Sequence, residues 1–185
     1  MREASSSQII PITIISSILV IAICLFITGC ENNNHNSSVE IISNGEKVNT
    51  SKLKHKICKG EGNIDSNSQA NMLFDIYYKN NDIFLLKSTQ QIISSKEETL
   101  DIYEESFENI RKHYEGLEYY DTEILKNETS IQYIQTINYE KIDIDKLLSI
   151  EGEKDNIVEN KKAKLDKWLT LSKRFGVKCE EAEDI

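Results

Sequence analysis

The first thirty residues restrict the fold most, because they contain an uncharged segment that is too long and too apolar for an element of a small globular domain. The uncharged apolar run from Ile9 to Ile27 is long enough to cross a bilayer as a helix. It ends in Thr28-Gly29-Cys30, and a polar stretch follows at once. Small residues directly before a cysteine are typical of a bacterial lipoprotein signal. The sequence therefore predicts cleavage after Gly29 and diacylglycerol on the thiol of Cys30.

An uncleaved transmembrane anchor is the alternative for this run, and the length alone slightly favours it. The Thr28-Gly29-Cys30 ending favours the lipoprotein signal, and the bulky Ile23 excludes Cys24 as the lipid site. Both alternatives place the rest of the chain on the extracytoplasmic face of the cell membrane. Acyl chains such as palmitate would hold it there, each buried methylene contributing about 0.8 kcal/mol.

The domain organisation follows from this signal. Residues 1–29 are the predicted signal peptide, 30–50 a flexible polar tether rich in Asn, Ser and Glu, and 51–185 a single domain. The net charge is −9, and it stays so after cleavage because the signal holds one arginine and one glutamate. An acidic domain argues against a nucleic-acid partner and against binding anionic lipid through charge.

Two cysteines of the predicted mature domain, Cys58 and Cys179, are candidates for a disulfide, which an oxidising envelope permits. Closing so long a loop would stabilise the fold by about 4–5 kcal/mol in loop-entropy models. The alternative is two unpaired, partly buried thiols. A zinc site would need more ligands than these cysteines and His55 supply. No metal or other cofactor is predicted.

The hydrophobic period of the domain changes between that of strands and that of helices. An apolar stripe from Leu100 to Tyr114 predicts a helix, with a capping box at its start on Ser95 and a stop at Gly116. We expect Gly60 to end or bend the first strand. The other segments are strands at 52–58, 72–78, 83–93, 117–125 and 129–139, a turn at 143–148, a polar loop at 151–160 and a helix at 161–175. The order β-β-β-α-β-β-α predicts an α+β fold, a mostly antiparallel meander sheet with two main helices packed on it.

Several short segments resemble the YehR-like family of small bacterial lipoproteins, whose function is not known. The similar residues are Ile57-Cys58, the hairpin at 77–82, 114–117 at the helix end, 137–147, and the segment 175–179 at the close. The similarity extends over about Leu53 to Glu180. It implies a lipid anchor and a small α+β domain, and it supplies no catalytic residues.

Recognisable catalytic motifs are absent from the sequence. The histidines are scattered, and the acidic residues of the first helix have the spacing of a solvated face. Asp143 and Asp145 are too few for a calcium loop. The adjacent pairs Tyr77-Tyr78 and Tyr119-Tyr120 must point to opposite faces of a strand. Their outer members would form a binding platform, or they are simply half-buried strand aromatics.

These observations predict a lipid-anchored envelope domain that is not an enzyme and binds a protein partner or small ligand. Two alternatives stay open. The domain could be an accessory subunit of a membrane complex, for which an exposed apolar patch would be expected. It could also be an envelope enzyme that uses dispersed carboxylates and tyrosines, for which a deep pocket holding at least two of them would be expected.

Overall fold

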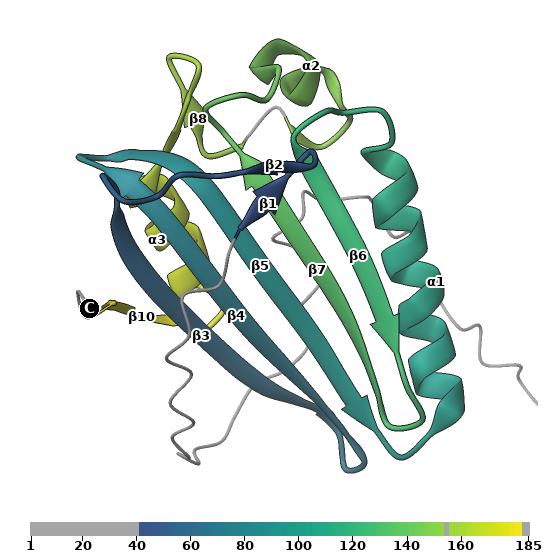
Figure 1. Ribbon diagram of the computed structural model, residues 1–185. Helices are drawn as coiled ribbons and strands as arrows, with labels where there is room; N and C mark the ends of the chain where they lie inside the picture. Colours follow the sequence, from purple (N-terminus) through teal and green to yellow (C-terminus); the bar gives the residue numbers. More distant parts are fainter. Residues whose placement is uncertain (1–40, 154–155, 183–185) are drawn as a thin grey trace, which may run out of the picture.

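The computed structural model describes residues 41–153 and 156–182. Within them, an eight-stranded antiparallel sheet carries two main helices on one face and a third, short helix at one end (Figure 1). This arrangement confirms the predicted α+β class. The strands of the sheet are β3 (Lys54–Asp65), β4 (Ser68–Lys79), β5 (Asp82–Ser94), β6 (Tyr120–Lys126), β7 (Ser130–Asn138), β8 (Val158–Glu159), β9 (Lys162–Lys164) and β10 (Lys178–Glu181). The helices are α1 (Glu97–His113), α2 (Ile144–Ser149) and α3 (Leu165–Lys173).

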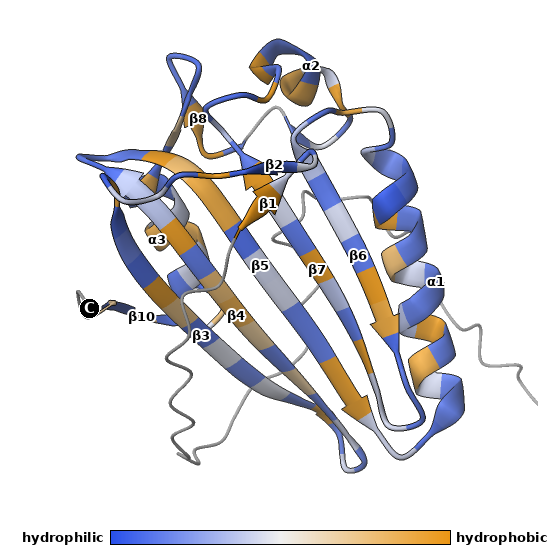
Figure 2. Cartoon of the chain, viewed as in Figure 1, coloured by the Kyte–Doolittle hydropathy of each residue, from blue (hydrophilic) through white to orange (hydrophobic). Residues whose placement is uncertain are grey.

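Long hairpins build the centre of the sheet. Along β4, buried and more exposed residues alternate, because successive side chains point to opposite faces. The inner face, which the helices cover, holds Phe74, Ile76 and Tyr78, and Figure 2 shows the apolar residues interleaved with polar ones along the strands. Asn80 turns the chain between β4 and β5 with φ of 57°, which Asn tolerates better than most residues. The hairpin predicted at 79–82 is therefore confirmed.

The second hairpin enters the sheet in an order that local patterns did not predict. Helix α1 carries the chain from β5 to β6, but β7 pairs with β5, so β6 forms the edge of the sheet. At the start of α1 the predicted capping box on Ser95 is wrong. Lys96 is the N-cap and makes no side-chain cap. The hydroxyl of Ser94 instead accepts a hydrogen bond from the Lys96 amide at 3.0 Å.

The first strand does not end at Gly60, as the sequence suggested, but continues to Asp65. The missing side chain of Gly60 leaves room for neighbours: a Cβ there would lie 2.9 Å from Met72 Cε and 3.0 Å from Val177 Cγ2. Glycine at this position therefore serves close packing rather than a bend.

Ordered structure also begins before the predicted end of the tether at residue 50. Strands β1 (Ile42–Ser43) and β2 (Glu46–Lys47) form a small hairpin in front of the sheet, on the face opposite the helices (Figure 1). The Ser43 hydroxyl and the Asn44 amide both donate to the Asp121 carboxylate on β6. Val48 also bonds back to the carbonyl of Ile41. The folded part thus begins by residue 41, and residues 30–40 lie outside the described residues.

The C-terminal third has more regular structure than its sequence suggested. The turn expected at 143–148 is helix α2, whose first turn is capped by the Asp143 carboxylate. The polar loop expected at 151–160 contains buried Glu153 and Ile157 and leads into β8. The last helix begins at Leu165 rather than near 161, because residues 162–164 form β9, whose last two residues pair with the start of β5.

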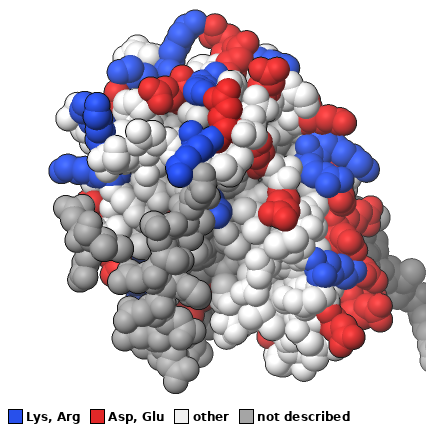
Figure 3. Space-filling model, viewed as in Figure 1, with Lys and Arg blue, Asp and Glu red and all other residues white. Residues whose placement is uncertain are grey.

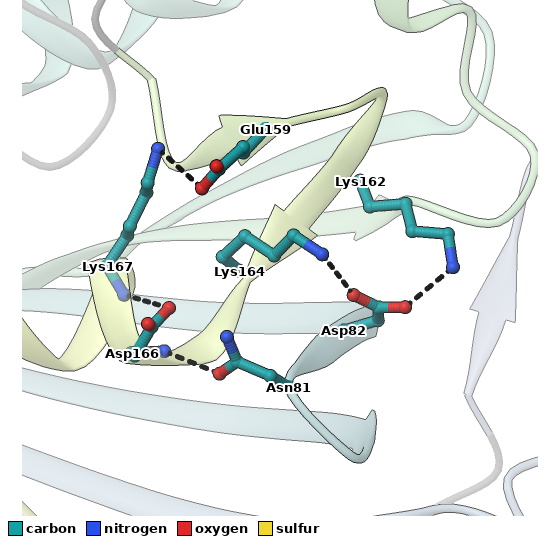
Figure 4. A network of polar contacts seen from close by, with 7 residues as sticks. All are labelled: Asn81, Asp82, Glu159, Lys162, Lys164, Asp166 and Lys167. Atoms are coloured by element: carbon teal, nitrogen blue, oxygen red, sulfur yellow. Dashed lines mark hydrogen bonds and ion pairs between the residues drawn. The ribbon is translucent and has the colours of Figure 1, made fainter.

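A polar network fixes this end of the molecule (Figure 4). Asp82 at the start of β5 lies 2.7 Å from Lys162 Nζ and 2.6 Å from Lys164 Nζ. The neighbouring Asn81 accepts from the amides of Leu165 and Asp166 at the start of α3. The β4–β5 turn is thereby attached to both β9 and α3.

The core consists of two apolar clusters on the inner face of the sheet. The larger, which we call the α3 core, surrounds Trp168, whose indole lies edge-on to Phe74 at 5.1 Å. The smaller, the α1 core, contains Leu100, Phe107 and Tyr133. Strand β10 then brings Cys179 directly opposite Cys58 on β3, and the two are joined as a disulfide. No helix among the described residues has both the length and the apolar character to cross a membrane.

Candidate functional site

Polar side chains separate the two core clusters on the inner face of the sheet. Ser88 on β5, Gln135 on β7 and Thr122 on β6 lie in one row of the strand register, and Gln90 lies in the next. Ser88, Gln90 and Gln135 are buried. We call these four residues the polar seam. Burying amides and hydroxyls is costly unless they are hydrogen-bonded, so such a row inside a core marks a candidate site.

Hydrogen bonds connect the seam to an aromatic side chain. Ser88 Oγ donates to Gln135 Oε1 at 3.2 Å, and Gln135 Nε2 donates to the Tyr120 hydroxyl. The Tyr120 ring stacks on Tyr114, the residue that follows the last residue of α1, with centroids 4.2 Å apart and planes 12° apart. The seam therefore continues from the middle of the sheet to the C-terminal end of α1.

At that end lies a pocket of about 420 Å³ between α1 and β6, which we call the α1–β6 pocket. Its volume is within the range of about 300–1,000 Å³ that is common for small-molecule sites. The residues that line it are Arg111, Lys112, Tyr114, Glu115, Gly116, Leu117, Tyr120 and Thr122. The aromatic pair and Leu117 give it an apolar wall, Thr122 brings in the seam, and the two cations come from the last turn of α1.

Behind the pocket, the Tyr114 hydroxyl donates to the carboxylate of Glu153, which also accepts from Asn156. Glu153 is only 1% exposed. Burial, with a smaller effect of Glu153 and Tyr114, raises the pKa of the Tyr139 phenol. Burial likewise raises the pKa of Tyr133. Both phenols thus stay protonated at neutral pH, where they can donate hydrogen bonds but cannot act as bases.

The outer face of the sheet holds a second polar group, around His55. Its Nε2 lies 2.9 Å from Asp75 Oδ1, and its ring stacks on Tyr77 with centroids 4.3 Å apart. Burial and the nearby Asp75 raise the pKa of Tyr77 to about 12. The exposed apolar side chains on this face are Leu73, Ile93 and Leu125, which lie on three different strands in different rows.

The Tyr77-Tyr78 pair separates to opposite faces, as predicted from strand geometry, but the Tyr119-Tyr120 pair does not, because Tyr119 packs against the same apolar cluster that contains Tyr120. Tyr77 lies on the outer face and Tyr78 on the inner one, while Tyr120 enters the core. Tyr119 has φ of 64°, and Lys141 lies over its ring at 5.3 Å. Because the second pair precedes and begins β6 instead of lying within a strand, the outer members do not form a continuous row.

The acidic stripe of α1 is exposed, as expected for a solvated helix face. Figure 3 shows its carboxylates along the side of the molecule where α1 lies. Lys126 of β6 reaches two of them, Asp101 at 2.5 Å and Glu104 at 2.7 Å. His113 makes a hydrogen bond to the carbonyl of Glu151. Over residues 41–153 and 156–182, no group of three or more His, Cys, Asp or Glu residues could hold a metal ion.

The predicted site residues have different outcomes. Gly29 and Cys30 lie outside the described residues, so cleavage and lipidation stay predictions. Cys58 and Cys179 are brought together. The α1–β6 pocket was not predicted. The helical stripe included Tyr114 and the strand pair included Tyr120, but nothing in the sequence indicated that their rings meet or that Glu153 lies behind them.

No protein-family model matches this chain, and no curated protein matches it. Two solved structures are similar. The first is the NMR structure of the E. coli YehR protein, with 17% identity, a TM-score of 0.49, and coverage of 72% of this chain and 94% of that one. The second is the NMR structure of a protein from Streptococcus pneumoniae TIGR4, with 17% identity, a TM-score of 0.45, and coverage of 83% of this chain and 99% of that one.

Proposed function

We propose that this chain is a lipid-anchored, non-enzymatic protein of the cell envelope that binds a ligand or protein partner outside the cytoplasmic membrane. The observation that carries the location is the sequence from Ile27 to Cys30, with an apolar run before it and a polar stretch after it. The Cys58–Cys179 disulfide supports an oxidising compartment.

A binding role is favoured over catalysis by the chemistry around the pocket. Burial raises the pKa of Tyr133 and Tyr139 near it, so neither phenol can act as a base at neutral pH. The buried Glu153 is held by the Tyr114 hydroxyl and Asn156, which fixes its position instead of directing it at a reacting group. The described lining of the pocket has no serine, cysteine or histidine that could act as a nucleophile beside a base, so its residues favour recognition of a ligand.

Metabolic labelling with a fatty-acid analogue in a bacterial host tests the location. We expect label on the wild-type chain and on Cys24→Ala, with the protein in the membrane fraction. Cys30→Ala should carry no label and should accumulate as the uncut precursor. Equal labelling of wild type and Cys30→Ala would overturn the lipoprotein assignment.

A pull-down from membranes, with the lipidated protein as bait, tests the binding role. We expect a partner or copurifying ligand that is retained by the wild-type chain and lost when the domain is unfolded by reduction and urea before mixing. If native and unfolded baits retain the same molecules, the folded domain does not provide the binding surface.

A further inference from the structure

We infer that the α1–β6 pocket is a site for a small organic anion, a carboxylate or phosphate joined to a flat apolar group. This inference deepens the proposed binding role and rests on it. The first argument is position: the hydrogen bonds of the polar seam end at Tyr120, which lines this pocket, whereas a second pocket of about 450 Å³ between β8 and α3 contains no residue of the seam.

The second argument is the charge at the rim. Arg111 and Lys112 line the pocket together with one carboxylate, Glu115, so two cationic side chains lie at the rim of a pocket on a chain whose net charge is −9. Arg111 already pairs with Glu108 at 2.6 Å, and its side chain is half exposed. A guanidinium has five N–H donors in a fixed plane, so Arg111 keeps donors for an anion after that pair forms.

The third argument is the apolar wall, which sets the rest of the ligand. Tyr114 and Tyr120 are stacked almost parallel, and Leu117 lies beside them in the lining. Hydrogen bonds hold both rings, through Glu153 for Tyr114 and through Gln135 for Tyr120. A wall so fixed suits a planar or ring-shaped group, while Thr122 offers a hydroxyl at the seam.

The test is a titration of the ¹⁵N-labelled full-length chain in a non-ionic detergent, followed by amide chemical shifts. The probes are benzoate, phenyl phosphate and inorganic phosphate, with neutral benzamide as the matched control. We expect benzoate or phenyl phosphate to give saturable shifts at Gly116, Leu117 and Thr122, and benzamide to bind at least about tenfold more weakly. The stronger of the two aromatic anions identifies carboxylate or phosphate as the head group.

Two arginine variants make the assignment specific. Arg111→Gln should weaken the aromatic anion about tenfold or more, because it removes a charge-assisted contact. Arg174→Gln, which changes an exposed arginine at the end of α3, should leave the affinity unchanged. Unchanged peak dispersion confirms that each variant is folded.

Three results would overturn the site: no saturable shifts with either aromatic anion, equal affinity for benzamide, or equal weakening by Arg111→Gln and Arg174→Gln. Saturation by inorganic phosphate alone would show an adventitious ion only. These failures are separate from failure of the proposed function, because labelling at Cys30 and retention of a membrane partner are measured without the probes.

Discussion

At the scale of single residues, Trp168 shows most clearly how local pattern and packing agree. The stripe of the last helix predicted it on the inner face, and in the fold it is 1% exposed. Its ring contacts Phe74 edge-on, which joins α3 to β4. The indole Nε1 is buried without a hydrogen-bond acceptor among the described residues. The contribution of this residue to stability should therefore come from its apolar area alone.

We expect Trp168→Ala to lower the free energy of unfolding by about 3–5 kcal/mol, because the cavity cannot close completely. Trp168→Phe should cost much less, since no hydrogen bond is lost. Urea denaturation followed by circular dichroism measures both, with the exposed Lys173→Ala on the same helix as the control. A native emission maximum typical of solvent-exposed tryptophan, or equal losses for Ala and Phe, would contradict the assignment.

At the scale of elements, the hydrophobic periodicity predicted the features that depend only on residues close together in the sequence. The hairpin at Asn80, the stripe of α1 and the inner face of α3 all follow from spacing within one segment. The position of β7 beside β5 and the attachment of residues 41–48 to Asp121 depend on contacts between distant segments. The α1–β6 pocket was missed for the same reason, because α1, β6 and residue 153 meet only in the fold.

Gly60 gives a prediction about strand β3, which was expected from the sequence to end or bend at this glycine. Gly60→Ala should destabilise the protein by about 1–3 kcal/mol, because the added methyl would crowd Met72 and Val177. Denaturant titration measures the loss. In Gly60→Ala/Val177→Ala the combined cost should be smaller than the sum of the single costs, since the smaller side chain relieves the contact. Strict additivity would show that the close packing is not the reason for glycine.

The disulfide is the second prediction at this scale, because it fastens β10 to the edge of the sheet. Reduction, or Cys58→Ser/Cys179→Ser, should lower the free energy of unfolding by about 4–5 kcal/mol for a loop of 121 residues. Amides of β10 should then exchange with solvent before those of β4 and β5, because β10 lies at the edge of the described sheet, next to β3. Alkylation of both thiols without prior reduction would show that the bond does not form in the cell.

At the scale of the whole molecule, electrostatics shows how an acidic chain stays folded. Several carboxylates have partners that lower their pKa. Lys162, followed by Lys164, has the largest effect in lowering the pKa of Asp82. The side chain of Asn81 has the largest effect in lowering the pKa of Asp166. Lys56 has the largest effect on Glu181. The contacts of Asp82 and Asn81 join the β4–β5 turn to β9 and α3. The contact between Lys56 and Glu181 joins the C-terminal strand to β3. The ion pairs therefore stabilise the same pairs of elements that strand pairing brings together.

The lowered pKa values determine how stability should depend on pH. A carboxyl whose folded pKa lies below its unfolded value, 3.8 for Asp82, stabilises the fold above that value. The contribution disappears as the pH falls through the lower, folded pKa. We therefore expect the free energy of unfolding to be steady at neutral pH and to decrease below about pH 4.

Asp82→Asn isolates one part of this dependence. It keeps the shape of the side chain but removes the charge that Lys162 and Lys164 face. The variant should be less stable than wild type at pH 7, and the difference should shrink as the pH falls through the lowered pKa of the wild-type carboxyl. Urea titrations at several pH values measure this, with the exposed Glu118→Gln as the control. A difference that does not decrease at any acidic pH at which the protein stays folded would mean that Asp82 acts through packing, because protonation removes the charge but leaves the shape of the side chain.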